Sequence, residues 1–449
     1  MYIVVIGLGE VGRHLLSVLD HEGHDVVAVD ASAEAVAYAE EHYDVACIVG
    51  YGASQEVLDR AGVSRADIVV AVSNHDEVNL IAALAAKQLG AKQAVARAQG
   101  DEWANWTEGI RYGLLGVDVV INPRVLVAQE LARVARSHGA SDVIDLSQDR
   151  VELVQIELQG ESRLFNKALK SIDLPTNALV AAIVRDGVLE VPGGDDVFQR
   201  GDRVYLIGSP DGVLAAERQF SRTREARRVC IVGGGVVGKS LARELKRSGA
   251  KVMLIEKNRD TAEAISVELE GIDVVHGDGT HQGLLEEEEV DSYDLFCAVT
   301  AMDEVNLMAS LLAKRVGCSR TAVTVQRADY VPIYKQLGID IVLSPRTVAS
   351  DHILRLSRGG MLHSLTVLED GQAEVVELTV SSQSPAVGRE LTKMRDLLPH
   401  GALLAAIIHG DQVVLPHGST KLSAGDRVIV MTKSHARKAV ERLFRPRHS

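Results

Sequence analysis

Long apolar runs and an excess of positive charge are both missing from this chain of 449 residues. Its longer apolar runs, such as Ala402–Ile408, fall well short of the ~20 residues that a helix needs to cross a bilayer. Acidic residues outnumber lysine and arginine by 62 to 48, and the net charge is −14. Nucleic-acid binding and direct adhesion to anionic lipid both need clustered cations, so we expect neither function.

Cysteine is also scarce, and its spacing excludes common cysteine sites. The chain has four cysteines, far apart, with no CxxC pair and no zinc-ligand spacing: Cys47, Cys230, Cys297 and Cys318. We therefore expect small buried apolar side chains in a reducing compartment. The chain begins directly with a strand-like segment, Tyr2–Ile6, and lacks the basic region of a signal peptide. These features predict a cytoplasmic protein.

The sequence does contain a second copy of itself. Ile3–Gly12 is echoed by Val229–Gly238, 226 residues further on. Asp-Glu-Val-Asn-Leu occurs at 76–80 and again, letter for letter, at 303–307. Further matches in the same order, at offsets of 222 to 227 residues, extend to the Gly-Asp-Arg-Val segments at 201–204 and 425–428. The whole chain is therefore predicted to be two diverged copies of one unit.

Each copy opens with short runs rich in valine and isoleucine, separated by helix-like stretches such as Glu77–Leu89. Uninterrupted apolar runs are typical of strands buried on both faces of a sheet. The pattern predicts an α/β fold with a doubly wound, Rossmann-like parallel sheet in each copy. Pro123 and Pro345 then each open a further helix, at the position that proline tolerates. The expected strands of copy one are Tyr2–Ile6, Asp25–Val29, Asp44–Val49, Ile68–Val72, Gln93–Ala96 and Val117–Ile121.

The later part of each copy has hairpin-like alternation and turn signals such as Asp186-Gly187, which predict a small α+β subdomain. A polar, basic stretch at 221–228 is the expected linker between the copies. The predicted Rossmann-like domains span 1–138 and 223–358, and the predicted small subdomains span 139–222 and 359–449.

Trp103 and Trp106 precede Ile110 and Leu114 at helical spacing. Packing of these side chains in a core is the first interpretation. A subunit contact is the alternative, because aromatic residues are enriched at interfaces.

A glycine-rich loop directly follows the first strand of copy one, and it reads Gly7-Leu8-Gly9-Glu10-Val11-Gly12. In this context Gly7 permits a tight turn, Gly9 lets a pyrophosphate approach the backbone, and Gly12 allows close packing of helix and sheet. The phosphates would lie at the N-terminus of the helix. Asp30, at the end of the second strand, can accept hydrogen bonds from ribose hydroxyls and would repel a 2′-phosphate, which favours NAD(H) over NADP(H).

Copy two repeats the loop as Gly233-Gly234-Gly235-Val236-Val237-Gly238. Glu256 replaces Asp30, and a longer carboxylate can still reach ribose. Lys257 and Arg259 follow, so a more negatively charged ligand is conceivable there. We therefore predict two nucleotide sites that differ in affinity or in ligand.

Further candidate ligands follow later strands. Ser73 and Asn74 come after the fourth strand of copy one, where they could reach ribose or the nicotinamide end of a dinucleotide. Copy two has Thr300-Ala301 at that place and so loses the amide. Asp278 replaces Tyr51 and could contact an adenine amino group. Arg97 and Arg327 are predicted to end the fifth strand of each copy, at the edge where ligands bind.

No catalytic or metal-binding motif accompanies these loops. The 15 histidines are scattered, and no zinc, Walker A, G-x-S-x-G or paired-carboxylate motif is present. A dehydrogenase would need a proton-transfer residue beside the nicotinamide. We therefore predict a nucleotide sensor without catalytic residues and without a metal. An NAD-dependent oxidoreductase of unusual domain order remains the alternative.

The glycine loops with their acidic partners, the Asp-Glu-Val-Asn-Leu segments and the Gly-Asp-Arg-Val segments together resemble the regulator-of-potassium-conductance (RCK) family. In that family a Rossmann-like half (RCK_N) precedes a small half called the RCK_C or TrkA-C domain. Two such units in one chain are similar to the cytosolic subunits of bacterial Trk potassium uptake systems. Tyr51 and Ala301 depart from the family pattern.

The resemblance implies a function and an assembly. Such proteins form rings of eight RCK units, here a homotetramer, on the inner face of the cell membrane. The implied partner is a membrane-embedded potassium-translocating subunit of the TrkH/TrkG type. NAD(H) and ATP or ADP would bind the Rossmann-like halves, and exchange between them would gate transport. The helices opened by Pro123 and Pro345 would carry motion to a neighbour.

Overall fold

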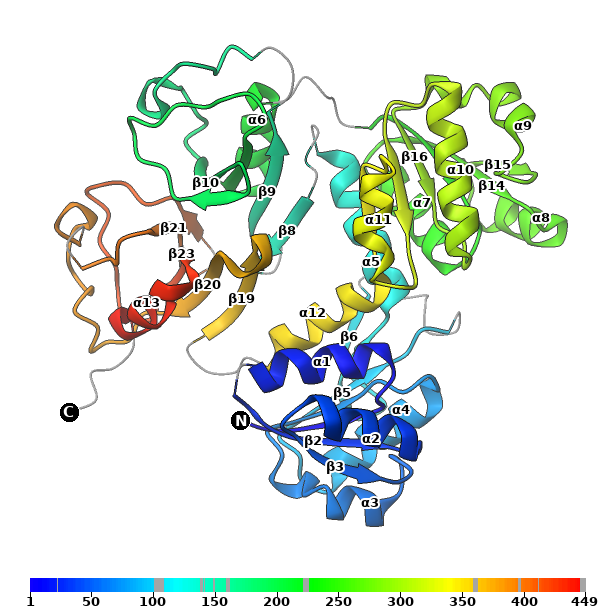
Figure 1. Ribbon diagram of the computed structural model, residues 1–449, viewed down its shortest axis with the longest axis horizontal. Helices are drawn as coiled ribbons and strands as arrows, with labels where there is room; N and C mark the ends of the chain where they lie inside the picture. Colours follow the sequence, from blue (N-terminus) through cyan, green and yellow to red (C-terminus); the bar gives the residue numbers. More distant parts are fainter. Residues whose placement is uncertain are drawn as a thin grey trace. The chain divides into compact units, whose positions relative to one another are not determined.

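The computed structural model describes residues 1–444 except 22, 101–108, 138–139, 141, 148–149, 159–161, 221–225, 358–361, 395–396 and 411 (Figure 1). The chain divides into two compact units, and each unit contains parts of both copies. The first unit comprises Met1–Ala135 and Ala226–Ser357, which are the two Rossmann-like halves. The second comprises Arg136–Glu225 and Arg358–Ser449, which are the two small subdomains.

A seven-stranded sheet forms the centre of the first Rossmann-like half. Its strands are β1 Tyr2–Ile6, β2 Asp25–Asp30, β3 Ala46–Val49, β4 Ile68–Ala71, β5 Gln93–Arg97, β6 Ile110–Leu114 and β7 Val117–Ile121. They lie in the order β3-β2-β1-β4-β5-β7-β6, and only the β6–β7 pair is antiparallel. The strand order reverses between β1 and β4, so their carboxyl ends border the crevice where such sheets bind ligands.

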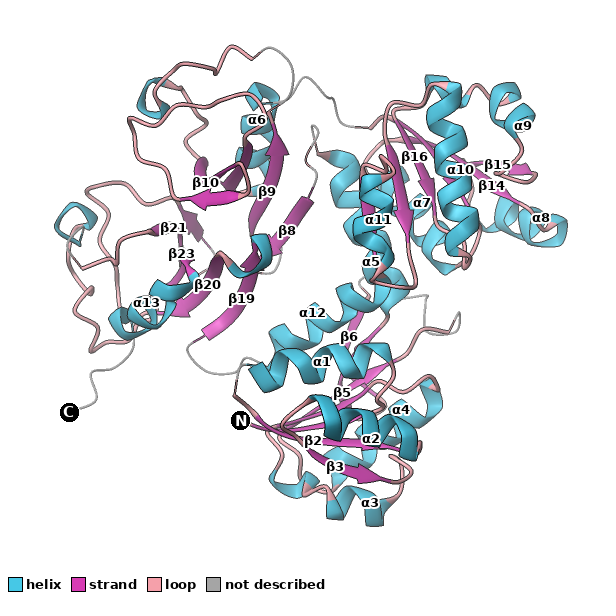
Figure 2. Ribbon diagram, in the orientation of Figure 1, coloured by secondary structure: helices cyan, strands magenta, loops and turns pink. Residues whose placement is uncertain are grey.

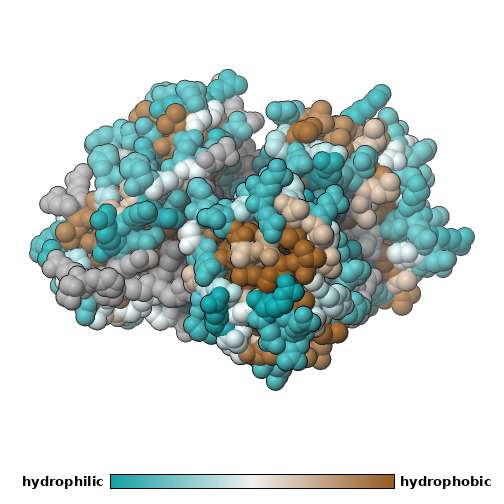
Figure 3. Space-filling view, turned by 60° about the horizontal axis from the view of Figure 1, so that its bottom comes forward, coloured by the Kyte–Doolittle hydropathy of each residue, from teal (hydrophilic) through white to brown (hydrophobic). Residues whose placement is uncertain are grey.

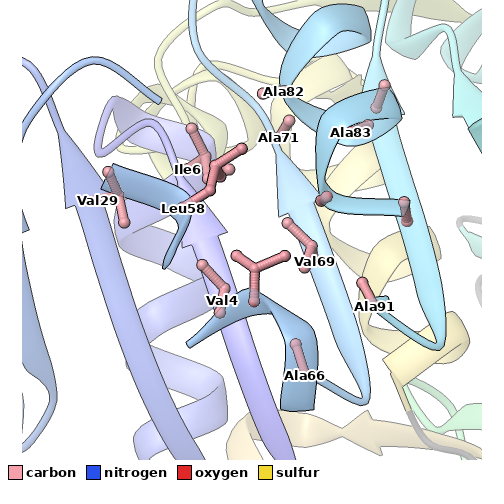
Figure 4. Close-up of a cluster of buried hydrophobic side chains, with 14 of the residues drawn as sticks. Val4, Ile6, Val29, Leu58, Ala66, Val69, Ala71, Ala82, Ala83 and Ala91 are labelled. Carbon is pink, nitrogen blue, oxygen red and sulfur yellow. The ribbon is translucent and has the colours of Figure 1, made fainter. Parts of the chain in front are cut away.

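Helices cover both faces of this sheet: α1 Glu10–His21, α2 Ala33–His42, α3 Gln55–Arg60 and α4 Asp76–Gln88. On one face, Val4 and Ile6 of β1 pack against Leu58 of α3 and the small side chains Ala82 and Ala83 of α4 (Figure 4). On the other face, α1 and α2 pack on the same strands. Alternate residues of β1 thus face opposite cores, as its uninterrupted apolar run predicts.

Copy two forms a matching six-stranded parallel sheet. Its strands, in the order β15-β14-β13-β16-β17-β18, are β13 Arg228–Val232, β14 Lys251–Glu256, β15 Asp273–His276, β16 Leu295–Ala298, β17 Thr321–Thr324 and β18 Ile341–Leu343. Its helices are α7 Val236–Arg247, α8 Arg259–Glu268, α9 Gln282–Glu287, α10 Asp303–Val316 and α11 Tyr330–Gln336. Helix α11 connects β17 to β18, where copy one has β6.

The last helix of each Rossmann-like half is α5 Pro123–Arg136 in copy one and α12 Pro345–Ser357 in copy two. Both begin at the predicted prolines. Helix α12 packs along α1 of the other copy (Figure 1). Its Ile353 and Leu354 are 1% and 3% exposed and join the core that Leu15 and Leu16 form in copy one. Copy two therefore supplies part of the hydrophobic core of copy one.

The small subdomains are antiparallel sheets, each followed by one helix (Figure 2). Copy one has β8 Asp142–Leu146, β9 Val151–Glu157, β10 Ala178–Arg185, β11 Val188–Glu190, β12 Arg203–Gly208 and α6 Pro210–Phe220, with the strand order β11-β10-β12-β9-β8. Copy two has β19 Leu362–Leu368, β20 Ala373–Thr379, β21 Ala402–His409, β22 Gln412–Val414, β23 Arg427–Lys433 and α13 Arg437–Phe444, with the order β19-β20-β23-β21-β22.

The two small subdomains share one core. Leu153 and Ile207 of copy one lie in the same buried cluster as Val375 and Ile429 of copy two. Glu369 of copy two accepts hydrogen bonds from Gln155 Nε2, Tyr205 Oη and Arg203 Nη2 of copy one at 2.7–2.8 Å. The burial of this carboxylate is therefore matched by three donors, and the two copies are joined within the second unit.

The structure confirms the predicted fold class and corrects several local expectations. Ile110 and Leu114 lie on β6, so the helical interpretation of their spacing was wrong, because a run of five residues gives little evidence of period. Trp103 and Trp106, and the linker up to residue 225, lie outside the described residues. All four cysteines are free thiols, three of them buried, and burial raises the pKa of Cys318 to about 11.

Candidate nucleotide-binding sites

The first glycine loop, between β1 and α1, has the backbone that its sequence predicts. Gly7 has a φ of +99°, which favours glycine strongly. A Cβ at Gly12 would lie 1.9 Å from the carbonyl oxygen of Gly7, so this position has no room for a side chain. A Cβ at Gly9 would meet nothing closer than 4.0 Å, so the space above Gly9 is open to a ligand.

Leu8 and Val11, also in the predicted set, are 1% and 3% exposed, so only their backbone faces a ligand. Helix α1 begins at Glu10, and the first N–H groups of its backbone lack helical partners. These groups and the helix dipole favour an anion at the loop.

Asp30 fixes the shape of this loop. Its carboxylate accepts hydrogen bonds from the backbone N–H of Leu8 at 2.6 Å and of Ser32 at 2.8 Å. One side chain therefore ties the end of β2 to the glycine loop. Asp30 ends β2, as predicted, and it is also a structural part of the loop.

A second network joins the ends of β4 and β5. The Asn79 side chain accepts hydrogen bonds from the backbone N–H and hydroxyl of Ser73, both at 2.7 Å. Its amide donates to the carbonyls of Ser73 and Arg97, both at 2.9 Å. Asp76 accepts from the N–H groups of Gln99 and Gly100. The repeated Asp-Glu-Val-Asn-Leu segment is thus a clamp for the strand ends beside the loop, a role that the sequence analysis missed.

Arg97 ends β5, as predicted, and is a buried cation. It is 5% exposed, and its Nη2 donates to the carbonyl of Ser73 at 2.6 Å and to Asn74 Oδ1 at 3.2 Å. Its Nε has no hydrogen-bond partner among the described residues. Desolvation lowers the pKa of Arg97, the carboxylate of Asp76 opposes this shift, and Arg124 adds to it. The end of the sheet in copy one therefore presents positive charge next to Asn74.

The loop of copy two has the same backbone. Gly233 has a φ of +109°, and a Cβ at Gly238 would lie 1.9 Å from the Gly233 carbonyl oxygen. A Cβ at Gly235 would meet nothing within 4 Å. Glu256 accepts hydrogen bonds from the N–H groups of Gly234 and Asn258, each at 2.7 Å. Glu256 therefore ties the end of β14 to this loop, as Asp30 ties the end of β2 to the first loop.

The predicted positive charges of copy two are already paired. Lys257 Nζ lies 2.8 Å from Asp278, and Arg259 Nε lies 2.9 Å from Glu263. Hydrogen bonds from Lys257 and Thr280 lower the pKa of Asp278 to about 2. Val236 and Val237 are 4% and 9% exposed, so they contribute backbone alone. The expected preference of copy two for a more negative ligand therefore has little support from Lys257 and Arg259.

Thr300 repeats the role of Ser73, since its backbone N–H and hydroxyl both donate to Asn306 Oδ1. Arg327, in contrast, does not end the fifth strand of copy two. Strand β17 ends at Thr324, whose carbonyl accepts from Asn306 as the Arg97 carbonyl accepts from Asn79. Arg327 lies three residues beyond the strand, with 57% of its side chain exposed, and pairs with Asp329 at 3.3 Å. Copy two thus has a threonine where copy one has its buried arginine.

One contact at the first loop links the two copies, and the sequence analysis missed it. Arg346, near the start of α12, forms an ion pair with Glu10, the first residue of α1. No sequence signal could have joined these residues, because the contact depends on α12 packing against the other copy.

The described residues form neither a metal site nor a membrane-spanning helix. Among the described residues, no group of three or more His, Cys, Asp or Glu side chains is placed to hold a metal ion. In the same part of the chain, no helix is both long and apolar enough to cross a membrane.

Comparison with known proteins identifies the family. The model of the TrkA-N domain matches residues 3–123 and 229–345, and the model of the TrkA-C domain matches residues 153–221 and 375–445. The chain belongs to the TrkA family. It is 36% identical over 446 residues to a Trk system potassium uptake protein TrkA homolog of Archaeoglobus fulgidus, covering 99% of this chain and 100% of the relative. It is 33% identical over 457 residues to the Trk system potassium uptake protein TrkA of Vibrio alginolyticus, with 99% of each chain covered.

Solved structures support the TrkA-family fold. The RCK domain of GsuK superposes with a TM-score of 0.60 at 19% identity, covering 99% of this chain and 94% of that chain. The GsuK channel bound to NAD gives the same TM-score and identity and covers 99% of this chain and 78% of that chain. At this level of identity the likeness concerns the fold alone.

Proposed function

We propose that this chain is the regulatory, nucleotide-binding subunit of a membrane potassium uptake system of the Trk type, and that it is not an enzyme. The observation that carries the proposal is the pair of glycine loops, each with an open space above its second glycine and an acidic residue tied to its backbone. NAD(H) and ATP or ADP are the proposed ligands. Family membership and the names of the relatives support the link to potassium uptake.

A structural neighbour supports nucleotide binding at these loops. The GsuK channel, which shares the fold over 99% of this chain, was solved bound to NAD. The present chain has the features that a dinucleotide needs, namely free N–H groups at the start of α1 and α7 and a carboxylate at the end of β2 and β14. Asp30, Glu256, Ser73, Thr300 and Arg97 are the proposed contacts beyond the loops.

A sensor fits the chain better than an oxidoreductase does. The second unit consists of two small β-sheets that share a core with each other, whereas a dehydrogenase needs a domain that brings substrate and a proton-transfer residue to the nicotinamide. Binding would act by favouring one conformation of the assembly over another, with a typical coupling of about 1–3 kcal/mol per site.

The proposed assembly is a ring of eight RCK units from four chains, docked on the inner face of the cell membrane through a potassium-translocating subunit of the TrkH/TrkG type. Figure 3 shows that apolar side chains reach the surface in clusters. Ile81 of α4 and Met308 of α10 occupy equivalent positions in the two copies and are 55% and 52% exposed. Exposed apolar residues at the same place in both copies support contacts between chains.

Potassium flux into vesicles tests the proposal. The protein is purified together with its own membrane subunit, reconstituted, and assayed with and without ADP, ATP and NADH. We expect flux to depend on nucleotide, and we expect Gly9→Asp with Gly235→Asp to remove that dependence, because each new carboxylate fills the space of a phosphate. Nucleotide-independent flux, or steady consumption of NADH by the isolated chain, would refute the proposal.

A further inference from the structure

The contact between Glu10 and Arg346 joins the phosphate loop of copy one to a helix of copy two. Glu10 is the first residue of α1, within the glycine loop, and its side chain is 50% exposed. Arg346 is the second residue of α12, and its side chain is 34% exposed. The guanidinium group of copy two is therefore paired with a side chain at the helix start where copy one would hold an anion.

Arg346 is held there by the packing of its helix. Helix α12 lies along α1, and Ile353 and Leu354 are buried in the core of copy one. Burial lowers the pKa of Arg346, but an arginine stays protonated near neutral pH. The loop therefore has a fixed positive charge beside it, and that charge is balanced by Glu10 while the ion pair persists.

Copy two has no equivalent of Glu10. Val236 occupies that place and is buried. The lysine and arginine that follow Glu256 pair with Asp278 and Glu263 instead. The two loops, which share their backbone, thus differ in the charges that surround them.

We propose that Arg346 is a phosphate-binding residue of the first site, supplied by the second copy, and that Glu10 holds it while the site is empty. This inference rests on the proposed nucleotide binding. The loop holds the first phosphate, and Arg346 then leaves Glu10 for the next phosphate. A guanidinium binds phosphate through paired hydrogen bonds, so the exchange is favourable only when the incoming group carries more charge than a carboxylate.

The exchange gives the first site a ligand preference. The terminal phosphates of ADP and ATP carry close to two charges, so they compete well with Glu10. The two phosphates of NADH are joined in a pyrophosphate bridge and carry one charge each, and AMP has no phosphate beyond the first. The first site therefore prefers nucleoside diphosphates and triphosphates, and this preference depends on Arg346.

The same exchange links the ligand to copy two. Arg346 is the second residue of α12, a helix of copy two. A ligand that draws Arg346 toward itself therefore acts on the first turn of a helix from the other copy.

The inference is tested by calorimetric titration of the full chain carrying Gly235→Asp. This substitution blocks the second site, so the heat measured comes from the first site alone. In that background we expect Arg346→Gln to weaken ADP and ATP binding about tenfold, because a charge-assisted contact with phosphate is lost. AMP and NADH binding should weaken less than about threefold. Glu10→Gln should tighten ADP and ATP binding about threefold, because the competing carboxylate is gone. Arg346→Lys should recover only part of the affinity. Arg247→Gln, which removes a surface arginine of α7 paired with Glu244, is the matched control and should change nothing.

The outcomes separate the two proposals. Weakening confined to ADP and ATP supports a phosphate contact. Equal weakening of all four ligands means that the ion pair only fixes α12, and the inference is then wrong. Unchanged ADP affinity also overturns it, while nucleotide binding itself stands. If the background protein binds no nucleotide but the native chain does, the inference alone fails; if neither binds nucleotide, the proposed function fails as well.

Discussion

At the scale of single residues, Gly12 is the position in the first loop with the least room. A Cβ added at Gly12 would lie 1.9 Å from the Gly7 carbonyl oxygen. Neither atom could rotate away, because a Cβ is fixed by its backbone and the oxygen belongs to the backbone. We predict that Gly12→Ala lowers the free energy of unfolding by more than about 2 kcal/mol. Urea denaturation measures this loss. Gly9→Ala is the control and should cost less than about 1 kcal/mol, since Gly9 has open space above it. Equal losses for the two variants would contradict the geometry.

Asn79 is the second critical residue at this scale, because it makes four hydrogen bonds from a fully buried position. We predict that Asn79→Ala costs about 3 kcal/mol of unfolding free energy, since it removes the side-chain partner of the Ser73 N–H and of the Arg97 carbonyl, while the Ser73 carbonyl keeps its hydrogen bond from Arg97. Asn74→Ala, which removes one exposed amide with a 3.2 Å contact, should cost less than about 1 kcal/mol. Thermal unfolding of both variants measures the difference, and similar midpoints would argue against the clamp.

Residues could be predicted from the sequence where backbone geometry alone selects them. Gly7 and Gly12, with Gly233 and Gly238 in copy two, are of this kind, because only glycine fits a positive φ or a position without room for a Cβ. Arg327 was misplaced because it was matched to Arg97 by residue type. The constant spacing from the Asp-Glu-Val-Asn-Leu segments points instead to Thr324, which the hydrogen bond from Asn306 identifies. The pairing of Glu10 with Arg346 requires the tertiary structure.

At the scale of elements, α12 is the clearest case of a helix that stabilises the other copy. We predict that Ile353→Ala costs about 2–4 kcal/mol, and that hydrogen exchange speeds up in α1 of copy one more than in the sheet of copy two. Ile265→Ala in α8 is the matched control, since Ile265 is 2% exposed and belongs to copy two. Faster exchange confined to copy two in both variants would rule out the swapped packing.

Elements with long apolar runs could be predicted from the sequence, but the elements against which they pack could not. The predicted β1 and β7 coincide with the observed strands, because buried parallel strands have continuous apolar sequence. Strand β6 was missed because its central residues are exposed and it lacks a continuous apolar run. The apolar face of α12 indicates that the helix packs against another element, but helical periodicity does not identify the copy to which that element belongs.

At the scale of the whole molecule, the proposed ring depends on contacts between chains. We predict that Ile81→Glu combined with Met308→Glu converts the tetramer into smaller species, because burial of a carboxylate at such a contact is unfavourable. Light scattering coupled to gel filtration measures the mass. Val267→Glu, at an exposed apolar residue of α8, is the control and should leave the tetramer intact. A tetramer that survives the double substitution would place the interface elsewhere.

Nucleotide binding without turnover is tested most directly by calorimetric titration of the intact chain with ADP and with NADH, accompanied by a record of NADH absorbance. We expect saturable heat for the native chain and none for the Gly9→Asp/Gly235→Asp variant, which should remain folded because both glycines have open space above them. We also expect NADH absorbance to stay constant. Absence of heat from the native chain, binding that persists in the variant, or steady loss of NADH would contradict the proposal.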